Sequence, residues 1–180
     1  MRVKYPRTLH HPSSAGVQSD DKIARDLSLF DGAEVVVTEK MDGENTTLYV
    51  DGFHARSIDI GKHPGRDWLA RFHGQMGYQI PQGWRVCGEN LYARHSVGYD
   101  ALPSYFLGFS IWDAAQNCLG WDDTVSHFAA WGVTPVSVLW RGTYDPGKLA
   151  EVTQSLVQTG RKAGSCDWRA LSRWVNFSAR

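Results

Sequence analysis

The alternation of apolar and polar positions along the chain predicts short strands with helices inserted between them. Strand-like runs occupy residues 34–40, 46–50, 53–57, 84–91, 105–112 and 136–140. Apolar side chains recur at helical spacing over residues 65–78, 122–131 and 145–157. Because the helices fall between groups of strands rather than after every strand, the pattern indicates an α+β fold rather than strict βαβ alternation.

Turn-forming residues place some of the boundaries between these elements. Ser19 to Asp21 can cap a helix that ends at Asp31-Gly32. Asp51-Gly52 is expected to form the hairpin turn between the second and third strands. Pro146 suits the first turn of the last helix. The run Tyr105–Trp112 is continuously apolar, which predicts a strand buried on both faces.

Composition limits the class of protein more than it defines it. The 180 residues are most simply one domain, here residues 1–158 followed by an atypical tail, residues 159–180. Nineteen basic and nineteen acidic residues give no net charge, so any contact with nucleic acid must use a local patch. Eight Trp, seven Tyr and seven Phe exceed the needs of a minimal core, so some aromatic faces are expected to stack on ligand rings or bases.

The cysteines and the N-terminus bear on location. Cys87, Cys118 and Cys166 are odd in number and widely spaced, which argues against a disulfide framework or a zinc site and favours a reducing cytoplasm. The N-terminus has no apolar leader-like run, and no stretch approaches the roughly 18 apolar residues of a membrane span. We therefore expect a cytoplasmic protein without a membrane partner.

The stretch Glu39-Lys40-Met41-Asp42-Gly43 is the strongest candidate for chemistry. An apolar strand delivers Lys40 to a turn containing Asp42 and Gly43. A lysine amine attacks phosphorus only when it is neutral, so the site must favour the neutral form by burial or by neighbouring positive charge, such as Arg56 or a metal ion. Taken alone, K-x-D-G is more often an exposed lysine beside a β-turn.

Four short motifs that follow one another along the chain change this interpretation. They are Glu39–Gly43, His54–Ser57, Cys87–Tyr92 and Tyr105–Asp113, and together they resemble the ATP-dependent RNA ligases, which belong to the covalent nucleotidyltransferases. The resemblance spans roughly residues 34–113. It implies an antiparallel-sheet adenylation domain of the ligase and capping-enzyme type, incomplete at its C-terminus.

The resemblance also implies a role for each matching residue. Lys40 would attack the α-phosphate of ATP to give lysyl-AMP, with Mg²⁺ as the metal. AMP would pass to an RNA 5′-phosphate, and an RNA 3′-hydroxyl would then seal the strand. The other implied contacts to the nucleotide are those of Glu39 with adenine, Asp42 and Gly43 in the turn, Arg56 with the phosphate or ribose, Glu89 with the ribose or metal, and Phe109 with the purine face.

Each of these side chains also has an interpretation without a ligand. Arg56 could be an ordinary surface arginine, and Phe109 could belong to the core. Glu89 is harder to explain in an apolar strand unless something positive meets it. At the level of function, the alternatives are a DNA ligase or capping-type nucleotidyltransferase and a non-catalytic remnant that binds nucleotide or RNA.

The tail departs from the family pattern. Neither the E-G-x-V strand, whose glutamate binds metal, nor the later K-x-K strand, whose lysines grip the α-phosphate, is present. We hypothesise that residues from Arg161 onward are read in a shifted frame, because codons displaced by one position can spell Glu-Gly-Arg-Leu-Val-Arg-Leu-Ala-Gly. This predicts impaired activity, and the gene's DNA sequence over the tail tests it.

Overall fold

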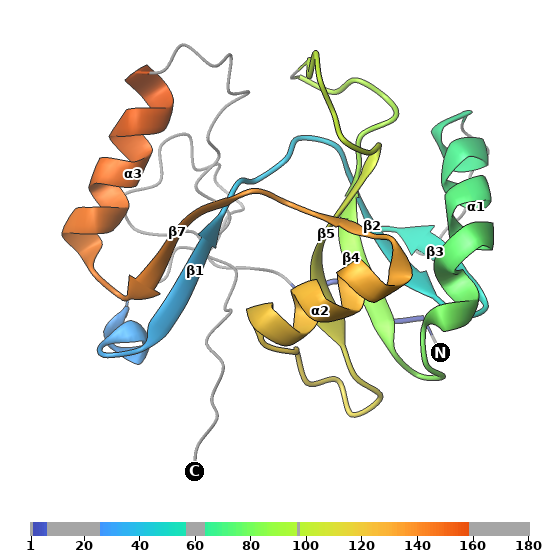
Figure 1. Ribbon diagram of the computed structural model, residues 1–180, viewed down its shortest axis with the longest axis horizontal. Coiled ribbons are helices and arrows are strands. Elements are labelled where there is room, and N and C mark those ends of the chain that lie inside the picture. The colour runs from blue at the N-terminus through green and yellow to red at the C-terminus, as the bar shows by residue number, and fades with distance from the viewer. Residues whose placement is uncertain (1, 7–25, 57–63, 97, 159–180) are drawn as a thin grey trace. The chain divides into compact units, whose positions relative to one another are not determined.

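A computed structural model of the chain describes residues 2–6, 26–56, 64–96 and 98–158 (Figure 1). The chain forms two compact units. One unit comprises residues 1–6 and 41–136, and the other comprises residues 7–40 and 137–180. The atypical tail predicted for residues 159–180 and position 57 of the predicted third strand lie outside the described residues.

A five-stranded sheet in the order β3-β2-β4-β5-β6 forms the centre of the first unit. Its strands are β2 (Glu44–Tyr49), β3 (Gly52–Ala55), β4 (Arg85–Asn90), β5 (Phe106–Trp112) and β6 (Thr134–Pro135). Neighbouring strands are antiparallel except the short β6, which pairs with β5 in parallel. The α+β fold with an antiparallel sheet is therefore confirmed.

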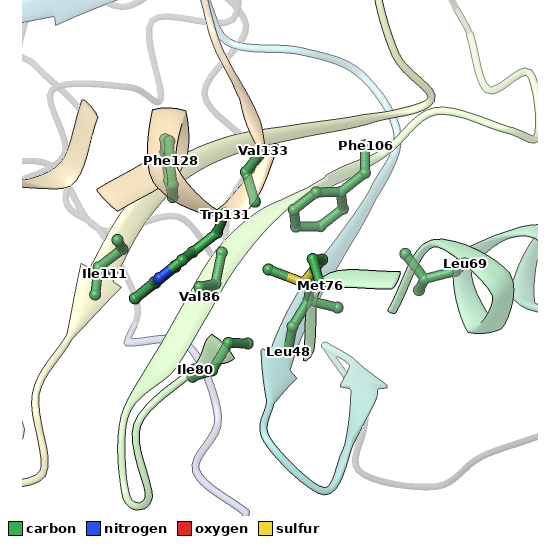
Figure 2. Packing of buried hydrophobic residues seen from close by; sticks show 10 residues of the cluster. All are labelled: Leu48, Leu69, Met76, Ile80, Val86, Phe106, Ile111, Phe128, Trp131 and Val133. Carbon is green, nitrogen blue, oxygen red and sulfur yellow. The ribbon is translucent and has the colours of Figure 1, made fainter. Parts of the chain in front are cut away.

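Two helices of this unit, α1 (Pro64–Met76) and α2 (Trp121–Trp131), pack on the same face of the sheet (Figure 1). A short 3-10 helix, Gly77–Gln79, follows α1. Figure 2 shows the apolar cluster that joins the helices to the strands: Leu48, Leu69, Met76, Ile80, Val86, Phe106, Ile111, Phe128, Trp131 and Val133. Leu48 of β2 and Val86 of β4 are paired in register and face this cluster, so the residues next to them along each strand lie on the opposite face of the sheet.

The second unit is smaller. Strand β1 (Glu34–Thr38) pairs antiparallel with β7 (Val138–Thr143), and helix α3 (Pro146–Gln158) follows β7. The Oδ1 atom of Asp145 accepts hydrogen bonds from the backbone amides of Gly147 at 2.8 Å and Lys148 at 3.1 Å, which caps α3 with Pro146 in its first turn, as predicted.

Several boundaries differ from the sequence prediction, and three of the differences change where the chain turns, pairs or coils. The hairpin between β2 and β3 turns at Val50-Asp51, because Tyr49 pairs with Gly52; the prediction of Asp51-Gly52 is wrong by one residue. The strand predicted over 136–140 is interrupted at Val136, whose amide donates to the Gly108 carbonyl at 2.9 Å, and continues as β7. Within the described part of the helix expected before Asp31, Ser28–Phe30 forms a 3-10 helix.

Candidate nucleotide-binding site

The sheet face opposite α1 and α2 carries polar side chains at the centre of the first unit. Thr47 on β2 and Cys87 on β4 meet there, with 3.7 Å between Oγ1 and Sγ. The next outward pair on these strands is Asn45 opposite Glu89, which is in register and on the same face. Glu89 is 9% exposed, so this carboxylate is held largely away from bulk water.

The turn that follows Lys40 is bonded directly to Glu89. The Gly43 amide donates to Glu89 Oε1 at 3.2 Å, and the Asp42 amide donates to the Tyr99 hydroxyl at 2.8 Å. A side chain at position 43 would place its Cβ 2.5 Å from the Asn90 carbonyl oxygen, so glycine is required for this approach. The K-x-D-G turn and the strand-borne glutamate therefore meet, although they lie far apart in the sequence.

Phe109 lies on this face, at a bulge of β5. Cys87 pairs with Ser110 and Gly88 pairs with Gly108, which leaves Phe109 as the extra residue. Its ring packs against the second apolar cluster of the unit, formed by Met41, Leu91, Leu107 and Val136. Phe109 is partly exposed, and the ring of Tyr5 meets it edge-on at 5.3 Å.

Arg56 lies at the edge strand of the same sheet. It is exposed and directly follows β3, two residues after His54. The His54 ring contacts the Tyr49 hydroxyl at 3.2 Å, which places His54 on the face that carries Glu89. The first unit thus provides a carboxylate on β4 and an aromatic ring on β5, with an arginine directly after the end of β3.

Glu39 and Lys40 belong to the second unit, at the point where the chain leaves β1. The Glu39 amide donates to the Ser137 carbonyl at 2.8 Å, which continues the pairing of β1 with the β7 segment. Both residues are partly buried. Lys40 immediately precedes Met41, the buried residue with which the first unit resumes.

The polar atoms beside Gly43 fit a divalent cation that is shared with phosphate. Asn45 Oδ1 is buried and has no hydrogen-bond partner among the described residues, and Asn45 stands opposite Glu89. Carboxylate and amide oxygens are ligands that Mg²⁺ accepts, with phosphates and water completing the shell. No three His, Cys, Asp or Glu side chains converge as metal ligands in the part of the chain that the structure describes. A cation here would therefore depend on the nucleotide for further ligands.

The thiol and phenol groups on this face of the sheet are not activated as nucleophiles. Burial raises the pKa of the Cys87 thiol above its usual value, so the thiol stays protonated at neutral pH. Burial likewise raises the pKa of the Tyr5 phenol, with Coulombic effects of Cys87 and Cys118 adding to it. These groups line the site as neutral side chains, and Lys40 remains the nucleophile that the sequence predicts.

Two residues at the site were missed by the residue-level sequence reasoning. Tyr99, which accepts the Asp42 amide hydrogen bond, follows Glu89 by ten positions and carries no local signal. Tyr5 lies in the Lys4–Thr8 stretch, which also resembles the RNA ligases in sequence, but this resemblance does not predict that Tyr5 packs on β5. Both contacts join residues remote in sequence and depend on the completed sheet.

Comparison with solved structures identifies the class of fold. An archaeal ATP-dependent RNA ligase matches with a TM-score of 0.62 and 15% identity, over 88% of this chain and 43% of that one. The Naegleria gruberi RNA ligase with PPi matches with a TM-score of 0.53 and 19% identity, over 64% of this chain and 39% of that one. The chain therefore spans about two fifths of the length of these structures. The fold is that of the ligase nucleotidyltransferase domain.

The RNA ligase family model matches residues 33–166, well over half of the chain. The chain belongs to the RNA ligase family. No curated protein matches the sequence. None of the helices in the described ranges is long and apolar enough to cross a membrane.

Proposed function

We propose that this chain is an ATP-dependent RNA ligase-type nucleotidyltransferase with Lys40 as its nucleophile. The observation that carries the proposal is the hydrogen bond from the Gly43 amide to Glu89, because it joins the turn after Lys40 to the sheet face that carries Glu89 and Phe109. Membership of the RNA ligase family and the fold of an archaeal ATP-dependent RNA ligase support the choice of reaction.

In the first step, the neutral Lys40 amine attacks the α-phosphorus of ATP. An N–P bond forms, the bond from the α-phosphorus to the bridging oxygen breaks, pyrophosphate leaves and the amine releases a proton to solvent. The AMP then passes from Lys40 to an RNA 5′-phosphate. Finally, an RNA 3′-hydroxyl attacks that phosphate, forming the phosphodiester and releasing AMP.

Each of the described side chains contacts a different part of the nucleotide. Phe109 supplies an aromatic face for the purine, and Arg56 supplies fixed donors to phosphate or ribose oxygens. Glu39 is assigned to the adenine edge, while Asp42 and Gly43 shape the turn beside Glu89. Mg²⁺, held by Glu89 with Asn45 and phosphate oxygens, would neutralise phosphate charge. The residues of the chain position the nucleotide and exclude water.

Incubation with ATP labelled at its α-phosphate, followed by mapping of the modified peptide by mass spectrometry, tests this proposal. We expect AMP on Lys40. Lys40→Ala and Lys40→Arg should carry no label. Label that persists in both variants, or a wild-type chain that neither binds ATP nor becomes labelled, would contradict the proposal.

Nucleotide and strand preferences separate the related activities. Label from GTP in place of ATP would indicate a capping-type reaction. Sealing of DNA ends in preference to RNA ends would indicate a DNA ligase. ATP affinity that is unchanged in Lys40→Ala, without any label on the wild-type chain, would indicate a nucleotide-binding remnant.

A further inference from the structure

A column of aromatic rings extends from the core of the first unit to its surface beside α1. Phe106 is fully buried, and its ring lies 5.5 Å from that of Phe72. Trp68 stacks on Phe72, with centroids 5.4 Å apart and planes inclined by 8°. Tyr105 meets Trp68 edge-on at 5.4 Å, and Tyr92 lies 5.3 Å from Tyr105 at 69°.

The outer end of this column is open to solvent. Tyr92 and Tyr105 are each 44% exposed, although both rings contact Trp68 or one another. Their neighbours hold the rings, so a ligand that stacks on them would meet a surface with little side-chain entropy left to lose. Exposed aromatic rings gathered in one patch often mark a binding surface.

The column is distinct from the proposed nucleotide site. Phe106 and Phe72 pack in the cluster between the sheet and the two helices, whereas Glu89 and Phe109 lie on the other sheet face. A nucleotide bound beside Glu89 therefore does not account for the exposed tyrosines. The exposed rings suit a second ligand that has flat, apolar faces.

Basic side chains accompany the rings. Arg71 is exposed on α1, three residues after Trp68 and so on a neighbouring helical position. Arg94 is exposed two residues after Tyr92. Aromatic faces for bases and cations for the backbone are the two features that single-stranded nucleic acid requires of a protein surface.

We propose that Tyr92, Tyr105 and Trp68 form a stacking platform for the bases of a single-stranded stretch of the RNA substrate. The inference rests on the proposed function for the identity of the ligand. Unpaired bases expose the faces that such rings can stack on, whereas duplex RNA keeps its bases stacked on one another. Arg71 and Arg94 contribute contacts to the phosphates on either side.

The test is fluorescence anisotropy with a short, unstructured, labelled RNA and the full chain. Stacking contributes about 1–3 kcal/mol per base, so each of Tyr92→Ala and Tyr105→Ala should weaken binding by about fivefold or more. Tyr92→Phe and Tyr105→Phe should retain most of the affinity. Tyr78→Ala is the matched control, because Tyr78 is 74% exposed and lies outside the ring column.

An abasic strand of the same length distinguishes stacking from charge. It should bind the wild-type chain and the double variant Tyr92→Ala/Tyr105→Ala equally. The proposal is overturned if the double variant binds RNA as the wild type does, if Tyr78→Ala weakens binding equally, or if the double variant only dissociates a dimer of the chain. Labelling of Lys40 by ATP, measured on the same samples, reports the proposed function separately from RNA binding.

Discussion

Phe109 is a residue for which the sequence allows two roles, packing in the core and stacking on a ligand. Its ring packs against the cluster that contains Met41 and Leu91, yet it remains partly exposed at a β-bulge. A core phenylalanine needs volume and apolar surface, whereas a purine platform also needs a π-face. Replacing Phe109 by leucine tests the two roles separately, because leucine keeps an apolar side chain but has no aromatic ring.

For Phe109→Leu we expect a free energy of unfolding within about 1.5 kcal/mol of the wild-type value, because the swap conserves most of the apolar volume. ATP affinity should fall by about fivefold or more, since a stacked base is lost. Urea denaturation and equilibrium ATP binding measure the two effects. Unchanged ATP affinity would assign Phe109 to the core alone.

Glu89 combines a structural and a proposed chemical role in one carboxylate. Glu89→Gln keeps an oxygen to accept the Gly43 amide and should change the free energy of unfolding by less than about 1 kcal/mol. Glu89→Ala removes the acceptor and should cost about 1.5–3 kcal/mol. Both variants should lose most of the Lys40 labelling, because both lose the negative charge proposed to hold the metal. Full labelling in Glu89→Gln would show that the charge is dispensable.

At the scale of elements, the close approach of the K-x-D-G turn to β4 depends on Gly43. In Gly43→Ala the new Cβ would lie 2.5 Å from the Asn90 carbonyl oxygen and 2.8 Å from Leu91 Cδ2. The strands must shift to relieve this, at a cost of about 1–3 kcal/mol. We expect reduced thermal stability together with loss of Lys40 labelling.

Gly74→Ala is the matched control for this substitution. Gly74 lies in α1, and a Cβ there meets nothing within 4 Å. Replacing a helical glycine by alanine should stabilise the protein by about 0.5–1 kcal/mol and leave labelling unchanged. A Gly43→Ala chain as stable and as active as Gly74→Ala would show that the turn tolerates a side chain.

The elements themselves were largely predictable from sequence, because α1 and α2 have apolar residues at helical spacing and β1 and β5 are largely apolar runs. The hairpin turn was misplaced since Gly52 carries a positive φ of 136° as a strand residue rather than as a turn residue. The bulge at Phe109 follows from the register of β4 against β5, which no local pattern reveals. The order of the sequence motifs predicted that Glu89, Gly43 and Phe109 belong to one site. It did not predict the hydrogen bond between Gly43 and Glu89 or the hydrogen bond to Tyr99.

At the scale of the whole molecule, the two units differ in the support that their sheets receive. The first unit has five strands, and its apolar cluster includes residues from two helices. Within residues 26–40 and 137–158, the part of the second unit that the structure describes, the strands are β1 and β7, and α3 follows them. A two-stranded ribbon is marginally stable by itself. The second unit should therefore open at a lower free energy than the first.

Native-state hydrogen exchange measures this difference. Amides of β4 and β5 should exchange only through the largest openings of the first unit, while amides of β1 and β7 should exchange sooner. Binding of ATP should slow exchange in β1 if Lys40 and Glu39 engage the nucleotide. Equal protection of β1 and β5 without ATP would contradict the expected hierarchy.

The pairing of β1 with β7 also has a consequence for synthesis of the protein. Among the described strands β1 pairs with β7 alone, and the partners Glu34 and Thr143 are 109 positions apart. A ribosome must therefore add the 109 residues that follow Glu34 before the whole strand that leads to Lys40 can pair with its partner. Until then the apolar segment Val35 to Val37 has no strand to pair with. We expect a nascent-chain chaperone to bind and shield it.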